Sequence, residues 1–356
     1  MKVCIVTVYN SINSGSFWQA FSLAQVLAKM GYDVSFYERD MSQGGSNSIK
    51  QQTIKGLKIL FRKGIFAAQR YCQSVWKFKK ALRYLKVIRK KSEGLKEIDC
   101  FILGSDTIWN FADDHFYNNY EIYLGKIFSP HKVITYAASA ANTTQKDCLK
   151  IPELKKIVTE WSAIGVRDEN TKLLLEKMTD TDIRVVCDPV FLLLKKDYSK
   201  WIKEISDEGY IFLYLFEKLS NVQIIELRTW ADEKGLLIIN GASVEKPWYC
   251  DKTIINSPFI FLSYMFYAAY VVTDTYHGTA FSIIFNKNFC VVDRGKKKVE
   301  DLLMRMNITD RIVNEKENII PVICNKLKDW EGNVGTFRDT SIEYLNMALG
   351  NDSETN

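Results

Sequence analysis

Short apolar runs alternate with longer segments of helical periodicity along the first half of the chain. Helical spacing of apolar residues occupies 17–30 and ends at Gly31. The apolar runs typical of buried strands are Val3–Val8, Asp33–Tyr37, Cys100–Leu103, Lys132–Ala137 and Ala163–Val166. Because strands that alternate with helices pair in parallel, this pattern predicts an α/β fold with a doubly wound sheet.

A second series of the same kind begins near Tyr210. Helices are expected around 224–234 and 259–269, between strands at 210–216, Leu236–Ile239, Tyr270–Thr273 and Phe289–Val292. A length of 356 residues suits about two domains. We therefore expect two Rossmann-like domains, 1–195 and 196–356, with the boundary in the charged stretch Lys195–Glu208. The last helix is expected either to stay with the second domain or to pack back on the first.

The segment Lys50–Lys91 departs from the rest of the chain in charge. It holds 14 Lys and Arg residues without any Asp or Glu, so the remainder of the protein is net negative. Its apolar residues recur at helical spacing, which predicts a basic amphipathic helical insertion at about 50–92. Two interpretations stay open: a solvated cover for the first domain, or attachment to an anionic surface, either a membrane or a lipid-pyrophosphate-linked substrate. Nucleic acid is not expected as a partner, because no nucleic-acid-binding motif is present.

Cysteine and histidine usage bears on location and metal binding. The eight cysteines are dispersed without a CxxC pair, and the three histidines do not cluster. Dispersed thiols suit a reducing compartment, and no metal site is expected. The apolar start is too short for a signal peptide, so we expect a cytoplasmic protein, with peripheral attachment to the inner membrane face if the basic segment binds lipid.

Polar loops that follow the first-domain strands hold candidate ligand-binding residues, because open α/β sheets bind ligands at the carboxyl ends of their strands. Asn13 and Gly15 precede a helix and suit an anion. In the segment 104–110, Asp106 stands close to Trp109; the alternative there is a helix-capping Asp with a packed Trp. Arg167 suits carboxylate or phosphate, although a surface ion pair with Asp168 is the commoner fate of such a residue.

The loop after the expected strand Tyr270–Thr273 carries His277 at the start of an apolar helix. Gly278 and Thr279 follow it and would offer a helix N-terminus to phosphate. Flanking polar residues favour a catalytic or phosphate-binding role for this histidine over a structural one. A cluster of cations, 294–298, stands shortly downstream.

Six motifs in this order resemble the polysaccharide pyruvyl transferase family, from Lys2 to about Asp310. They are NSGSFWQAFSL, GSDTIWN, TYAASA, IGVRDENT, CDPVFLL and AAYVVTDTYHGTAFSIIFNKNF. The chain departs from the family's closing pattern at Thr275, Tyr276 and Asn288, where Ser, Phe and Pro are usual. The first two changes keep a hydroxyl and an aromatic ring.

The resemblance implies a GT-B-like fold with the active site in the interdomain cleft. It also implies transfer of a pyruvyl group from phosphoenolpyruvate to a sugar, forming a cyclic ketal and releasing phosphate. Arg167 and His277 match the family's donor-binding and catalytic motifs. A downstream family lysine corresponds to Lys297, with its neighbours Lys296 and Lys298 left open.

From these assignments we expect a mechanism in which His277 protonates C3 of phosphoenolpyruvate or holds its phosphate. Arg167 and Lys297 hold the donor's anionic groups, Asp106 orients or deprotonates the acceptor hydroxyl, and Trp109 lies beside the acceptor. Phosphoenolpyruvate is a substrate, so no cofactor is expected, and the acceptor is a saccharide of a surface polysaccharide or its lipid-linked precursor. The rival functions are a GT-B glycosyltransferase that uses a nucleotide sugar and a noncatalytic membrane scaffold.

Overall fold

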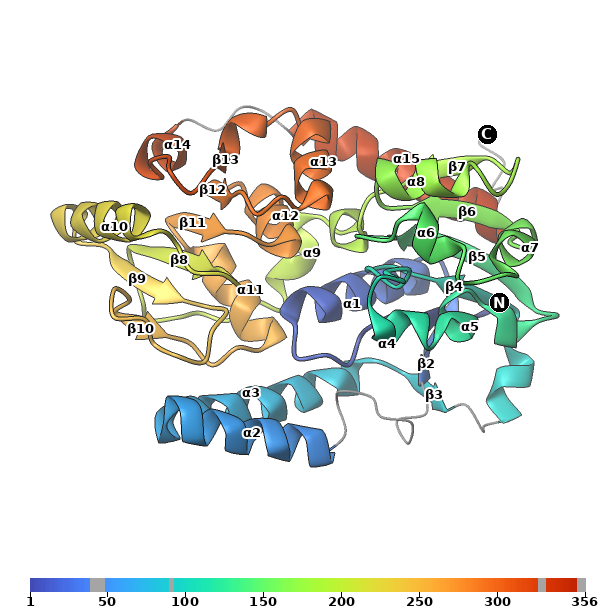
Figure 1. Ribbon diagram of the computed structural model, residues 1–356, viewed down its shortest axis with the longest axis horizontal. Helices are drawn as coiled ribbons and strands as arrows, with labels where there is room; N and C mark the ends of the chain where they lie inside the picture. Colours follow the sequence, from blue (N-terminus) through green and yellow to red (C-terminus); the bar gives the residue numbers. More distant parts are fainter. Residues whose placement is uncertain (39–48, 90–92, 326–330, 351–356) are drawn as a thin grey trace.

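Two parallel sheets, each covered by helices, make up the chain (Figure 1). The computed structural model describes residues 1–38, 49–89, 93–325 and 331–350. The first sheet has the order β3-β2-β1-β4-β5-β6-β7. Its strands are β1 Lys2–Val6, β2 Asp33–Glu38, β3 Val87–Arg89, β4 Cys100–Leu103, β5 Lys132–Ala138, β6 Ala163–Val166 and β7 Ile183–Val185. Its helices are α1 Ser14–Lys29, α4 Asp114–Tyr117, α5 Tyr120–Tyr123, α6 Gln145–Cys148, α7 Leu154–Thr159 and α8 Glu169–Leu175.

The second sheet has the order β10-β9-β8-β11-β12-β13. Its strands are β8 Tyr210–Tyr214, β9 Leu237–Asn240, β10 Lys252–Thr253, β11 Tyr270–Thr273, β12 Asn288–Val292 and β13 Ile312–Val313. The helices from this part of the chain are α9 Lys195–Ser199, α10 Asn221–Lys234, α11 Pro258–Tyr267, α12 Tyr276–Ile284, α13 Lys297–Arg305, α14 Ile320–Cys324 and α15 Glu331–Leu349. The prediction of two doubly wound domains is confirmed by these sheets.

The burial of the central strands explains why continuous apolar runs in the sequence predicted their positions. Every residue of β4 and β8 is buried, because helices cover both faces of each sheet and leave no side to water. Helix boundaries follow local capping chemistry as well. For example, Ser220 and Gln223 form a capping box at the start of α10, and Gly235 ends that helix at a φ of 64°.

Aromatic packing and a returning helix hold the two domains together. The indole of Trp18 in α1 donates a 2.9 Å hydrogen bond to the carbonyl of Pro258 in α11. Helix α15 crosses from the second domain to the first sheet, where the Tyr344 hydroxyl donates to the carbonyl of Thr135 at 2.7 Å (Figure 1). These contacts are buried, so the cleft between the domains has a set geometry.

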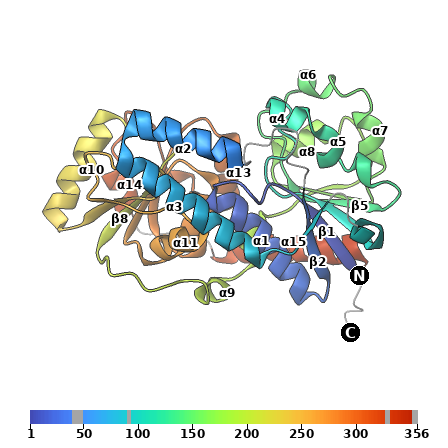
Figure 2. The same ribbon diagram turned by 90° about the horizontal axis from the view of Figure 1, so that it is seen from below.

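The basic segment forms a hairpin of two helices, α2 Ile49–Lys63 and α3 Ile65–Ala81. It lies beneath the second domain in Figure 1, and Figure 2 shows α2 and α3 side by side across that face. Lys63 pairs with Glu245 at 2.9 Å, and the Arg70 Nε donates to the carbonyl of Val244 at 2.6 Å. The segment therefore lies against the second domain as well as the first, where Ala81 at the end of α3 belongs to the same core cluster as Phe21 of α1. The expected helical insertion also ends early, because β3 pairs with β2 at the sheet edge.

None of the helices within the described ranges is long and apolar enough to cross a bilayer.

Candidate active site

A cavity of about 310 Å³ lies where the carboxyl ends of the two sheets face each other. In each sheet the strand order reverses there, at β1/β4 and at β8/β11, which is where open α/β sheets bind ligands. The residues that line it come from both domains: Val8, Asn13, Ser16, Asp106, Thr107, Phe116, Tyr214, Phe216, Thr275, Tyr276, His277, Lys296 and Lys298. The cavity is thus an interdomain site.

His277 enters this cavity from the first turn of α12. The Thr275 hydroxyl caps the helix by accepting from the Gly278 N–H at 2.9 Å, which sets the position of the first turn. Gly15 in α1 lies against the imidazole, since a Cβ there would be 2.3 Å from Nδ1 of His277. The side chain of His277 is only 11% exposed. A glycine at position 15 therefore makes room for the histidine across the domain boundary.

Asp188 is the central residue that our sequence reasoning did not assign to the site. One oxygen, Oδ2, lies 3.5 Å from Nε2 of His277 and 3.1 Å from Nη1 of Arg167. Burial by itself would raise the pKa of this carboxyl, but His277 and Arg167 outweigh burial and lower the pKa to about 2. Asp188 is therefore ionised and lies against both the imidazole and the guanidinium. The sequence signal that could have identified Asp188 is an acidic residue inside the otherwise apolar motif CDPVFLL.

Arg167 stands directly behind two residues of the cavity wall. Its guanidinium lies 4.9 Å from the ring centre of Tyr276 and 3.8 Å from Oδ1 of Asp106. Within the described residues, Nε and Nη2 are buried without a hydrogen-bond partner. The alternative of an ion pair with Asp168 is wrong, because Asp168 caps α8 by accepting from Thr171.

Asp106 presents its carboxylate to the cavity from an unusual backbone conformation. Its φ is 75°, a left-handed value that few residues other than glycine adopt. Ser16 donates to Oδ2 at 3.0 Å. Burial acts to raise the pKa of Asp106, but Arg167, Lys298 and His277 together lower it below its usual range. The group is accordingly a charged hydrogen-bond acceptor and a weak base.

Of the three neighbouring lysines, Lys298 is the one that approaches this group of charges. Burial and the nearby Arg167 lower the pKa of Lys298 to about 8. Lys296 also lines the cavity, and its ammonium donates to the carbonyl of Asp274 at 2.9 Å. Lys297, the residue that the resemblance indicated, is exposed and does not line the cavity of about 310 Å³, which is called the inner cavity from here on. Lys298, a neighbour that was left open, thus lines this cavity together with Lys296, whereas Lys297 lines only the larger cavity beside it.

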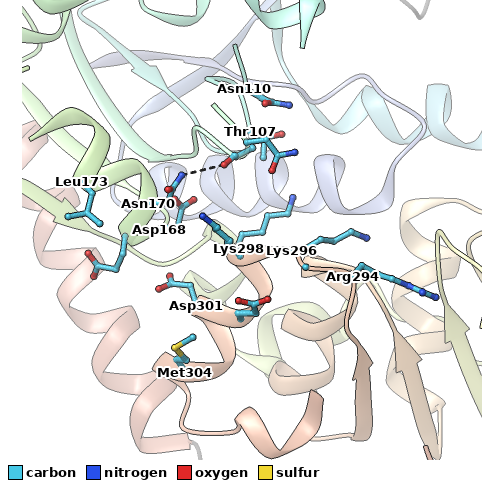
Figure 3. Close-up of a pocket in the computed structure, with 16 residues that line it drawn as sticks. Thr107, Asn110, Asp168, Asn170, Leu173, Arg294, Lys296, Lys298, Asp301 and Met304 are labelled. Atoms are coloured by element: carbon cyan, nitrogen blue, oxygen red, sulfur yellow. Dashed lines mark hydrogen bonds between the residues drawn. The ribbon is translucent and has the colours of Figure 1, made fainter. Parts of the chain in front are cut away.

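A larger cavity of about 640 Å³ adjoins the first and shares Thr107, Lys296 and Lys298 with it. Figure 3 shows the first-domain residues on one side and α13 on the other. Polar side chains around it include Asn110, Asn142, Asp168, Asn170 and Asp301. Amide and carboxylate groups of this kind suit the hydroxyls of a sugar.

A comparison of the amino-acid sequence with known protein families identifies the family of this chain. A profile described as polysaccharide pyruvyl transferase matches residues 13–296, which is well over half of the chain. The chain belongs to this family. It is therefore a transferase that acts on polysaccharide, as the six motifs predicted.

Comparison with solved structures shows the fold. A protein from Listeria monocytogenes described as a UDP-N-acetylglucosamine 2-epimerase has a TM-score of 0.56 at 10% identity, over 99% of this chain and 97% of that one. The complex of S. aureus MnaA with UDP has a TM-score of 0.52 at 11% identity, over 100% and 98%. Both support a GT-B architecture for this member of the pyruvyl transferase family. No curated protein matches the chain.

Several residues that the sequence placed in the site have other roles in this pyruvyl transferase family member. Trp109 is 2% exposed, stacks on Trp161 with 5.0 Å between ring centres, and donates from Nε1 to the Tyr123 carbonyl. It is the packed tryptophan of the alternative interpretation and does not line either cavity. The hydroxyl of Thr279 is also buried and donates to the carbonyl of Thr275 at 2.9 Å.

The two predicted anion-binding glycines use their N–H groups for helix capping. Gly15 donates to Oδ1 of Asn13 at 2.8 Å, and Gly278 donates to Thr275. A Cβ on Gly278 would lie 2.1 Å from the Thr273 hydroxyl, so this glycine is required by packing. Asn13 lines the inner cavity while it caps α1. In the described part of the chain, no cluster of three His, Cys, Asp or Glu residues is arranged to hold a metal ion.

Proposed function

We propose that this enzyme transfers the pyruvyl group of phosphoenolpyruvate to two hydroxyls of a saccharide, forming a cyclic ketal and releasing phosphate. The observation that carries the proposal is the placement of His277 and Lys298 in the wall of one small cavity, with Arg167 directly behind that wall, beside a larger polar cavity. Phosphoenolpyruvate is small and carries a carboxylate and a phosphate. Two anionic groups on a compact donor match several cations in a confined site.

Arg167 supports the donor assignment through its unpaired nitrogen atoms. A buried donor left without a partner costs about 1–3 kcal/mol, and more for a charged group. In the described residues Nε and Nη2 lack such a partner, while Asp188 occupies only Nη1. An anionic group of the donor would satisfy these atoms. Lys298 would hold the second anionic group, because it lines the cavity and is close enough to Asp106 and Arg167 for their charges to shift its pKa.

In the first chemical step, an acceptor hydroxyl adds to C2 of the donor. The C2–C3 double bond takes a proton from the His277 imidazolium, so C3 becomes a methyl group. The hydroxyl proton passes to the phosphate group of the donor. Asp106 accepts a hydrogen bond from the attacking hydroxyl and orients it.

In the second step, the bond between C2 and the phosphate oxygen breaks and hydrogen phosphate leaves. The positive charge that develops at C2 faces the ionised Asp106. The second acceptor hydroxyl then adds to C2, and its proton returns to His277. Both protons, the phosphate and the ketal are thus accounted for, and the histidine is ready for another turnover.

Parallel incubations test the proposal against its rival. The protein is given phosphoenolpyruvate or a UDP-sugar together with a panel of saccharides, and phosphate, UDP and the mass of the saccharide are measured. Phosphate release coupled to a pyruvate ketal on the saccharide is expected. Release of UDP with glycosylated product, and no consumption of phosphoenolpyruvate, would replace this proposal with the glycosyltransferase.

A further inference from the structure

Helix α2 carries an apolar stripe that nothing in the described chain covers. Ile54, Leu57 and Phe61 follow one another at spacings of three and four residues and therefore share one side of the helix. They are 43%, 50% and 85% exposed. Ile65 and Phe66 follow directly in the chain, at the start of α3, and are 67% and 73% exposed. Large apolar side chains gathered in this way mark an interaction site.

The hairpin is fixed to the protein through the buried face of α3 and through the ion pair between Lys63 at the end of α2 and Glu245. In α3 the buried residues include Ala67, Tyr71 and Phe78, which recur on one face. Figure 2 shows α2 and α3 side by side across the second domain, so both helices of the hairpin keep one side toward solvent. The exposed stripe is therefore presented on a structured support.

Positive charge surrounds this stripe. Lys55, Lys58 and Arg62 are exposed on the adjoining side of α2, where they line a cavity of about 410 Å³ with Val244 of the second domain. The whole segment from 50 to 91 lacks acidic residues. A basic helix with an uncovered aromatic and aliphatic side has the composition of an interfacial membrane helix.

We propose that the α2–α3 hairpin docks on an anionic lipid bilayer, with Phe61, Ile65 and Phe66 entering the interface. The exposed lysines and arginines of the hairpin would meet lipid phosphates. The absence of negative charge favours an anionic lipid surface over a protein surface of mixed charge. This inference does not depend on the reaction proposed for the cleft.

Vesicle co-sedimentation of the full chain tests the proposal. Wild-type protein is expected to sediment with vesicles of phosphatidylcholine plus phosphatidylglycerol and to stay in solution with phosphatidylcholine alone. The variant F61S/I65S/F66S is expected to bind the anionic vesicles at least tenfold more weakly. A matched variant, L149S/V222S/I225S, removes three apolar side chains that are exposed elsewhere and is expected to bind as wild type does.

Hydrogen exchange shows where the contact is made. Anionic vesicles are expected to slow exchange of amides in α2 and at the start of α3 while leaving α15 unchanged. Absence of sedimentation, or equal binding by the F61S/I65S/F66S variant, would overturn the proposal. A dimer seen by light scattering without lipid, and lost in that variant, would overturn it too and show a second copy as the occupant.

Discussion

Two regions of this protein gather positive charge, and they do so in opposite ways. In the cleft, Arg167, His277 and Lys298 stand among the carboxylates of Asp106 and Asp188 and are largely removed from water. In the α2–α3 hairpin, cations are exposed, and the described residues of its two helices contain no carboxylate. The net charge of the whole chain reveals neither the balanced charges of the cleft nor the unbalanced positive charge of the hairpin.

This difference shows that the burial of a cationic side chain determines which kind of anionic group it can bind. Buried cations interact strongly and must be balanced by fixed acids, so they hold a small anion in a single geometry. Exposed cations are screened by salt and tolerate many geometries, so they suit an extended anionic surface. The following changes should affect one region and spare the other.

The largest effect is expected from His277→Gln in the cleft. Loss of the proton donor should lower kcat by roughly 10² to 10⁴ while the fold and vesicle binding remain, because the side chain is similar in size. Phosphate release from phosphoenolpyruvate in the presence of acceptor measures the effect. His131→Gln, far from the cavity, is the control; a near-normal rate in the His277 variant would make that residue structural.

Gly15→Ala should act through the same histidine without touching its chemistry. The added methyl group would overlap Nδ1 of His277, so the ring must move. A displacement of about 1 Å can cost about 10² in rate, which is the loss we expect in kcat. Gly335→Ala, in α15 with open space around it, is the matched control and should leave kcat unchanged. A fully active Gly15 variant would show that the close approach has no role.

Lys298→Met and Lys297→Met distinguish two adjacent lysines. Loss of a charge-assisted contact costs about 1.5–3 kcal/mol, so KM for phosphoenolpyruvate should rise roughly 10- to 150-fold in the Lys298 variant. Lys297→Met should change it little, because that side chain faces away from the inner cavity. The reverse ranking would restore Lys297 to the donor site.

The pH dependence of donor affinity sharpens the same assignment. Lys298 is charged below its pKa of about 8 and neutral above it. Affinity for the anionic donor should therefore be present below pH 8 and fall as the pH rises through that value. Lys298→Arg, which stays charged, should keep KM flat over the same range, and an unchanged slope in this variant would assign the titration to another group.

The smallest effect is expected from salt on the cleft. Raising ionic strength from about 0.01 M to about 1 M shortens the Debye length from about 30 Å to about 3 Å. Vesicle binding by the hairpin should be lost, whereas KM for phosphoenolpyruvate should change only modestly because its cations are buried. Equal sensitivity of the two measurements would remove the distinction between the regions.

Much of the fold was determined by local sequence. Strands buried on both faces must be apolar throughout, so β4 and β8 could be read as continuous runs. His277 follows such a strand and begins a helix, and topology alone brings that position to the ligand-binding edge. The motifs also predicted the family correctly.

Tertiary structure decided the rest, because the remaining questions concern which way a side chain faces. Lys297 and Lys298 differ by one position on α13, and only packing of that helix sends one of them into the cavity. Trp109 is close to Asp106 in sequence, yet its indole belongs to the core. Asp188 lies in the segment that connects the two domains. It meets His277 only because that segment packs against α12. Sequence alone thus determined the central strands and their order along the chain, while contacts between distant segments determined the site and the short edge strands β3, β7, β10 and β13.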